Sequence, residues 1–162
     1  MSRFKLLVFA LAVLVVLGIT AYAQDADNNT HLGTWVVTVT PPAASGRPAF
    51  NALITFSGGG AFIASTQNDH LIPNSGVQQG TWIRTSTGSI ESIELAFVYA
   101  PTGLALDATV KVRATYDFPD ADNLTGQGQL ARCDQNGANC MALPGLASIT
   151  GKRVEVEEPA IP

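Results

Sequence analysis

The chain contains few of the residues from which catalytic and metal centres are built. It has only two histidines, and no third ligand stands at a spacing that would complete a zinc site with His31 and His70. No serine lies in a nucleophile-elbow pattern, and no loop has the spacing of an EF-hand calcium loop. The sequence therefore predicts no catalytic residue, no metal and no cofactor, and favours binding over enzyme activity.

Positive charge is scarce as well. The chain has 9 lysines and arginines against 13 aspartates and glutamates, which gives a net charge of -4. Proteins that bind nucleic acid or anionic membranes gather basic residues on one face, and this sequence has no basic cluster. We therefore expect neither kind of partner for the mature protein.

A long hydrophobic run occurs only at the N-terminus. Two basic residues precede the apolar segment Leu6–Ile19, and Ala21-Tyr22-Ala23 follows it as a small-x-small cleavage site. The apolar segment is shorter than an ordinary membrane span, which disfavours the alternative of an uncleaved anchor. We expect a secretory signal peptide over residues 1–23, cleaved after Ala23, and hence a secreted or periplasmic protein.

The remaining residues suffice for one domain of ordinary size. Its cysteines, Cys133 and Cys140, flank a loop that contains the turn dipeptide Asn136-Gly137. Two cysteines this close in an exported protein favour a disulfide over a metal site or a redox pair. We expect a disulfide-clamped turn within a barrel domain over residues 24–156, followed by a disordered tail over residues 157–162.

Alternation of apolar and polar residues dominates the sequence after the signal segment. From Leu104 to Phe118 the even positions are apolar, whereas the odd positions from Asp107 onward are polar. This pattern is typical of a strand with one buried face. The run is long for one strand, so we expect a bend or a bulge within it. Further strands are expected at Gly33–Thr40, Ala49–Ser57, Ala61–Thr66, Val77–Thr85, Ile90–Tyr99, Asn123–Arg132 and Ala147–Val156.

Short turns rich in glycine and proline separate these strands. Sequential strands with one apolar face must either close into a barrel or stack as two layers. A Greek-key sandwich needs at least one long crossover, so the short turns favour closure. We predict an all-β fold, a closed antiparallel up-and-down β-barrel of about eight strands. A β-sandwich is the alternative.

Each tryptophan of the chain follows Gly-Thr, in Gly33-Thr34-Trp35 and in Gly80-Thr81-Trp82. A glycine where a strand begins indicates a close backbone approach. Gly-x-Trp at the start of the first strand of a small secreted barrel resembles the lipocalins and their calycin relatives. In that group the tryptophan lies at the closed end of the barrel, and a basic residue of the last strand packs across its ring. The resemblance implies that Arg153 stacks on Trp35 beside Gly33, in a structural role. The Thr-Asp-Tyr motif of lipocalins is absent.

Aromatic and branched residues expected on inward faces are the candidates for a ligand pocket. They are Phe62, Trp82, Phe97, Tyr99, Val110, Val112 and Tyr116. Small residues such as Ala64, Ala96 and Gly128 could leave room among them, or could let the strands curve tightly around a filled core.

Three functions remain open on this basis. The first is a secreted lipocalin-like barrel that binds a small apolar ligand without catalysis, with the loop Gln67–Gly76 as a lid. The second is a filled barrel that acts as an extracellular or periplasmic interaction module. The third, an isomerase or cyclase, would use Tyr99, Tyr116 or Asp107 as acid–base groups at the barrel mouth. The volume inside the barrel distinguishes the first from the second.

Overall fold

The structure is a computed structural model and describes residues 30–67, 76–103 and 105–155. Its strands are β1 (Gly33–Thr40), β2 (Phe50–Phe56), β3 (Ala61–Thr66), β4 (Gln78–Arg84), β5 (Ile90–Tyr99), β6 (Leu106–Asp117), β7 (Asn123–Cys133), β8 (Met141–Ala142) and β9 (Ala147–Arg153). Two short 3-10 helices, η1 (Ala43–Ser45) and η2 (Gly58–Gly60), lie in the connections after β1 and β2.

The chain divides into two units, Met1–His31 and Leu32–Pro162, and the strands belong to the second. The expected signal peptide, the body of the expected lid and the expected C-terminal tail lie outside the described residues. No helix within the described ranges is long and apolar enough to cross a membrane.

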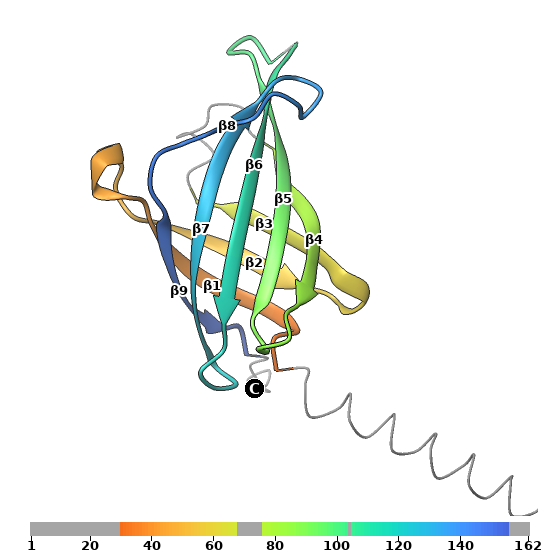
Figure 1. Cartoon of the computed structure of the whole chain (residues 1–162), viewed down its shortest axis with the longest axis vertical. Helices are drawn as coiled ribbons and strands as arrows, with labels where there is room; N and C mark the ends of the chain where they lie inside the picture. The colour runs from red at the N-terminus through yellow and green to blue at the C-terminus, as the bar shows by residue number, and fades with distance from the viewer. Residues whose placement is uncertain (1–29, 68–75, 104, 156–162) are drawn as a thin grey trace, which may run out of the picture. The chain divides into compact units, whose positions relative to one another are not determined.

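The described strands join one antiparallel sheet that closes on itself. Each strand from β1 to β7 pairs with the next, β7 pairs with β9, and β9 pairs with β1. Figure 1 shows β5, β6 and β7 side by side at the front, with β1, β2 and β3 crossing behind them. The short β8 pairs only with the end of β7 and stands outside the ring. The prediction of a closed antiparallel barrel is confirmed, and the sandwich alternative is wrong.

The long alternating run forms β6, with a bulge near its start. Val98 of β5 pairs with Ala108, but the following residue, Tyr99, pairs with Leu106, which leaves Asp107 as the extra residue. The expected irregularity is therefore present. A bulge of this kind increases the local twist of its strand.

Packed aromatic side chains close one end of the barrel. The ring centroid of Phe56 lies 5.1 Å from that of Phe62 and 5.2 Å from that of Tyr116, both in edge-to-face geometry. Such pairs stabilise a core beyond the burial of their area. We call this group the aromatic floor, and its members are Trp35, Phe56, Phe62, Trp82, Tyr116 and Phe118.

Arg153 joins the last strand to the first at the aromatic floor. Its guanidinium carbon lies 4.4 Å from the ring centroid of Trp35, which is 0% exposed. Nη1 donates a hydrogen bond of 2.6 Å to the carbonyl of Leu32, and Nε donates one of 2.7 Å to the carbonyl of Ala121. The predicted stack of Arg153 on Trp35 is therefore present. Gly33, at φ +123°, leaves space for the guanidinium, because a Cβ there would lie 2.9 Å from Nη1.

Gly80, from the second Gly-Thr-Trp, also marks a close backbone approach. It pairs with Glu94 of β5, and a Cβ on Gly80 would lie 2.0 Å from the carbonyl oxygen of Ile93. Any larger residue would therefore push β4 away from β5. Trp82, two residues on, belongs to the aromatic floor and donates from Nε1 to the carbonyl of Ser57 at 3.0 Å.

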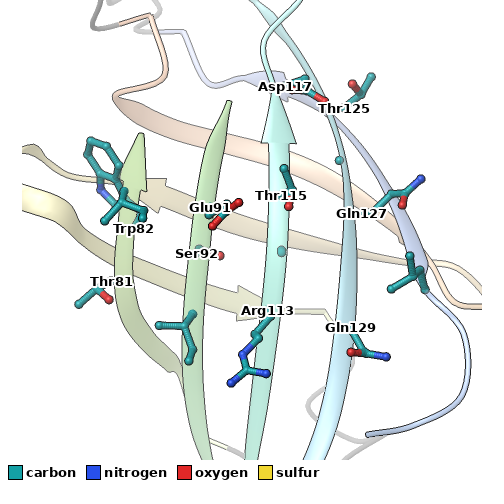
Figure 2. A pocket seen from close by; sticks show the side chains of 15 residues that line it. Thr81, Trp82, Glu91, Ser92, Arg113, Thr115, Asp117, Thr125, Gln127 and Gln129 are labelled. Atoms are coloured by element: carbon teal, nitrogen blue, oxygen red, sulfur yellow. The ribbon is translucent and has the colours of Figure 1, made fainter. Parts of the chain in front are cut away.

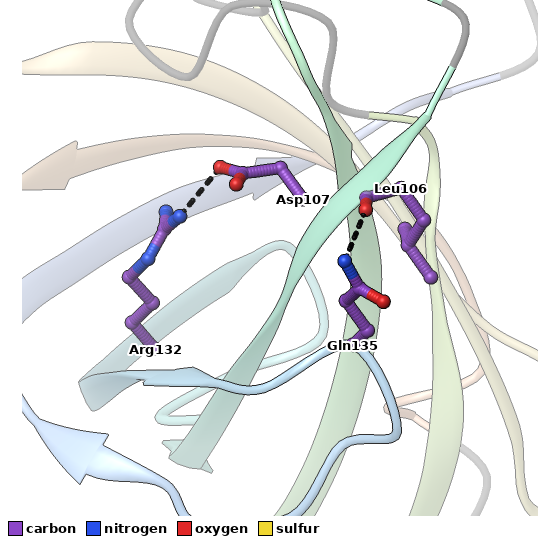
Figure 3. A network of polar contacts seen from close by, with 4 residues as sticks. All are labelled: Leu106, Asp107, Arg132 and Gln135. Carbon is purple, nitrogen blue, oxygen red and sulfur yellow. Dashed lines mark hydrogen bonds and ion pairs between the residues drawn. The ribbon is translucent and has the colours of Figure 1, made fainter.

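Cys133 and Cys140 form the predicted disulfide. The loop between them folds against the outer face of β6, where the side-chain amide of Gln135 donates to the carbonyl of Leu106 at 2.7 Å (Figure 3). The loop covers Thr109, which is only 2% exposed although it lies on the outward-facing side of its strand. The disulfide thus holds a cover over the outside of the barrel near the end opposite the floor.

Replacing Arg153 by alanine should destabilise the barrel by about 2–3 kcal/mol, because a cation–π contact and two hydrogen bonds to carbonyl groups are lost. In a Trp82→Phe background, which leaves Trp35 as the sole tryptophan, the emission of Trp35 should shift to longer wavelength. Urea denaturation followed by fluorescence measures both effects. Arg132→Ala, which removes an exposed ion pair, is the control and should cost less than about 1 kcal/mol. Equal stability and an unchanged spectrum in Arg153→Ala would contradict the role of the stack.

Replacing Gly80 by alanine should lower the free energy of unfolding by about 2 kcal/mol or more, because the added methyl group overlaps the backbone of β5. Gly58→Ala is the matched control, since no heavy atom lies within 4 Å of its Cβ position. Thermal denaturation compares the two variants. Equal melting temperatures would show that the strands separate here without cost.

Candidate functional site

A cavity of about 360 Å³ lies inside the barrel, above the aromatic floor. Its wall consists largely of apolar side chains that point inward from the strands, including several alanines whose small size leaves space unfilled. These wall residues are Val37, Val39, Ala52, Ile54, Ala64, Ala96, Val110, Val112, Leu130, Ala147 and Ile149. We call this space the barrel cavity.

Two proline-containing segments line the barrel cavity at the end opposite the floor. Pro41-Pro42 follows β1, and Leu143-Pro144-Gly145 precedes β9. The two segments are in contact, because a Cβ on Gly145 would lie 2.8 Å from the ring of Pro42. The amide of Leu143 donates to the carbonyl of Leu130 at 2.8 Å, which ties this segment to β7. Arg47, from the connection between β1 and β2, brings a positive charge to the same rim.

Glu94 places a carboxyl group in the wall of the barrel cavity. The residue lies on β5 and is 3% exposed. Its Oε1 accepts a hydrogen bond of 2.9 Å from the hydroxyl of Ser92 and one of 3.4 Å from the hydroxyl of Tyr116. Its Oε2 makes no hydrogen bond to the residues that the structure describes. An apolar cavity therefore contains a carboxyl group with one oxygen still able to accept.

The surroundings of Glu94 make its charge sensitive to pH near neutrality. Burial raises the pKa of Glu94 from 4.5 to about 7, because the low dielectric disfavours the carboxylate, and the hydrogen bonds from Ser92 and Tyr116 offset part of that rise. Burial, followed by the charge of Glu94, also raises the pKa of Tyr116 well above its usual range. The phenol therefore stays neutral while the carboxyl group changes charge.

Some of the pocket residues predicted from sequence line the barrel cavity, some belong to the aromatic floor, and some face outward. Val110, Val112 and Tyr116 line the barrel cavity, as the alternation of β6 indicates. Phe62 and Trp82 point inward but belong to the aromatic floor, where they close the barrel instead of lining the cavity.

The placement of Phe97 and Tyr99 in the pocket is wrong. Both face outward from β5, and Phe97 is 54% exposed. The prediction followed the more apolar face of the strand, whereas the inward face of β5 carries polar residues. Asp107, an acid–base candidate at the mouth, is the bulged residue on the outer surface and forms an exposed ion pair with Arg132 at 2.6 Å (Figure 3).

Glu94 was missed by sequence reasoning, although one signal for it exists. Residues directly opposite in neighbouring strands share a face, and Glu94 pairs with Val112 of β6. The inward face of β6 is clear from its own alternation. If β5 is paired with β6 and the bulge is taken into account, the residues of β5 opposite the inward-facing residues of β6 must also face inward. Glu94 is one of these residues.

A second depression, of about 910 Å³, lies on the outer face of β4 to β7 (Figure 2). Side chains of both charges and of neutral polar character project from it, namely Glu91, Arg113, Thr115, Gln127 and Gln129. All five are exposed to water, so a ligand would exchange little water contact for protein contact there. The barrel cavity is therefore the candidate site.

Among the described residues, no group of three or more His, Cys, Asp or Glu side chains could hold a metal ion. Comparison of the chain with protein families, with curated proteins and with solved structures finds no match.

The protein should lose stability as the pH rises from about 4.5 to about 7, the pKa values of Glu94 in the unfolded and folded states. In this window the unfolded chain ionises at Glu94 while the folded protein keeps the proton, so this contribution is fully present below the window and lost above it. The loss should amount to roughly 3 kcal/mol. Urea denaturation of wild type and Glu94→Gln across this range should show a steep decline only in the wild type. Glu91→Gln, on the outer face of the same strand, should retain the decline, and parallel curves for all three proteins would contradict the assignment.

Proposed function

We propose that this protein is a non-catalytic binding protein whose barrel cavity holds a small, mostly apolar molecule. The observation that carries the proposal is the volume of about 360 Å³ left within the barrel. Ligand pockets start at about 300 Å³ and combine apolar walls with a few polar groups. Because an engineered apolar cavity of about 150 Å³ accommodates benzene, the barrel cavity has room for a molecule of about two to three rings or for a medium-length chain.

The chemistry of the wall supports this choice of ligand. Aliphatic side chains from both halves of the barrel surround the space, and Glu94 with Tyr116 supplies the polar groups in its wall. An apolar ligand body would leave water for these walls, which contributes about 25 cal/mol for each Å² of apolar surface buried. The fixed polar groups would orient one end of the ligand.

We also propose that the protein is exported and lipocalin-like. The N-terminal segment has the layout of a signal peptide, and the disulfide between Cys133 and Cys140 is a bond that persists in oxidising compartments. The lipocalin resemblance rests on Gly33-Thr34-Trp35, on Arg153 in the last strand and on the number of strands, and the contact of Arg153 with Trp35 is compatible with it. These observations support a secreted or periplasmic carrier.

The other two functional hypotheses have weaker support. The interaction module is favoured by Ile93, Leu95 and Phe97, which follow one another on the outer face of β5 and are between 38% and 54% exposed. Its premise is a filled barrel, however, which the barrel cavity does not fit. The isomerase or cyclase hypothesis loses Tyr99 and Asp107, since both lie on the outside of the barrel.

The neutral dye N-phenyl-1-naphthylamine, whose nitrogen is not protonated at neutral pH, should bind with enhanced fluorescence. Ala96→Phe, which fills the barrel cavity from β5, should weaken that binding at least roughly tenfold. Leu95→Phe introduces the same ring at the adjacent, outward-facing position and should leave the affinity unchanged. Fluorescence titration measures both variants. Equal weakening by the two substitutions, or no binding by the wild type, would count against the barrel cavity as the site.

A further inference from the structure

We propose that the ligand of the barrel cavity is an amphipathic amine, whose apolar body fills the cavity and whose ammonium group pairs with Glu94. This inference rests on the proposed function, since it specifies the ligand of the same cavity. It starts from a carboxyl group that the fold places among apolar walls, where its burial lowers stability above neutral pH unless a partner compensates it.

The geometry at Glu94 suits a nitrogen with several N–H groups. Oε1 already accepts hydrogen bonds from Ser92 and Tyr116, whereas Oε2 accepts none from the residues that the structure describes. An ammonium group could donate to Oε2, and the hydroxyl oxygen of Tyr116, which also lines the cavity, can accept a second N–H. A hydrogen bond between an ammonium and a carboxylate is about twice as strong as one between neutral groups. The low dielectric of the apolar cavity wall strengthens it further. These contacts offset the cost of removing the ammonium from water.

Other head groups fit this position less well. A carboxylate ligand would face the charge of Glu94, or would require Glu94 to hold its proton. A hydroxyl group could donate a single hydrogen bond to Oε2 without charge compensation. Arg47 is the positively charged residue among those that line the cavity, and it lies at the rim, so an acidic ligand would be expected to place its head there.

The groups that face Glu94 predict how binding depends on pH. Glu94 pairs with Gly80 on β4 and with Val112 on β6, neither of which titrates. Tyr116 stays neutral, because burial raises its pKa well above the usual range. Below a pH of about 7 an ammonium must displace the proton of Glu94. Its affinity should therefore rise roughly tenfold per pH unit up to neutrality and then level off.

The test compares octylamine, octanol and octanoate as competitors of N-phenyl-1-naphthylamine. These probes share one chain length and differ in the head group. At a pH of about 8, octylamine should displace the dye at a concentration at least about tenfold lower than octanol, and octanoate should compete weakest. In Glu94→Gln the advantage of the amine and its pH dependence should disappear while the dye still binds. Glu91→Gln should behave as the wild type.

The outcomes separate this inference from the proposed function. If the dye binds and octanol or octanoate competes as well as octylamine, the amine assignment is overturned while the cavity remains a binding site. An advantage of octylamine that persists in Glu94→Gln overturns it as well. If neither the dye nor any competitor binds, both proposals fail together. Retained dye binding in Glu94→Gln also shows that the variant has folded.

Discussion

The contact between Arg153 and Trp35 ties the last strand to the first, and the interior of this protein exists because the sheet is closed there. Without closure, β1 and β9 would present unpaired edges, and the inward-facing apolar side chains of the strands would be exposed to water. The same contact seals the aromatic floor. Because that end is filled by rings, the remaining free volume lies toward the other end, where Pro42 meets Gly145.

Features that depend on neighbouring residues in the chain could be predicted from the sequence. The alternation along Leu106–Asp117 predicted the inward face of β6. The turn residues between the strands predicted their up-and-down order. The short separation of Cys133 and Cys140 sufficed for their disulfide. Arg153 required the resemblance to lipocalins, because nothing in its own strand indicates which ring it meets.

Features that depend on packing across the barrel could not be predicted in this way. Alanine residues such as Ala64 and Ala96 are compatible with an empty interior or with strands that curve around a filled one, and only the three-dimensional arrangement distinguishes these cases. The burial of Thr109 depends on a loop that starts at Cys133 and returns over β6. The inward position of Glu94 was difficult to predict for two reasons. Its own strand is more apolar on the outer face, and Tyr116, which donates a hydrogen bond to it, belongs to the neighbouring strand β6.

The polarity of β5 has a consequence for how the protein folds. A slip of one residue would turn Ile93, Leu95 and Phe97 into the core, but it would also exchange Glu94 for Glu91 and expel the buried Ile90 and Val98. The close fit of Gly80 against β5 and the bulge at Asp107 in β6 also fix the native register from the neighbouring strands. In this barrel, one strand thus turns its larger apolar side chains toward the outside, and its orientation depends on the two strands that pair with it.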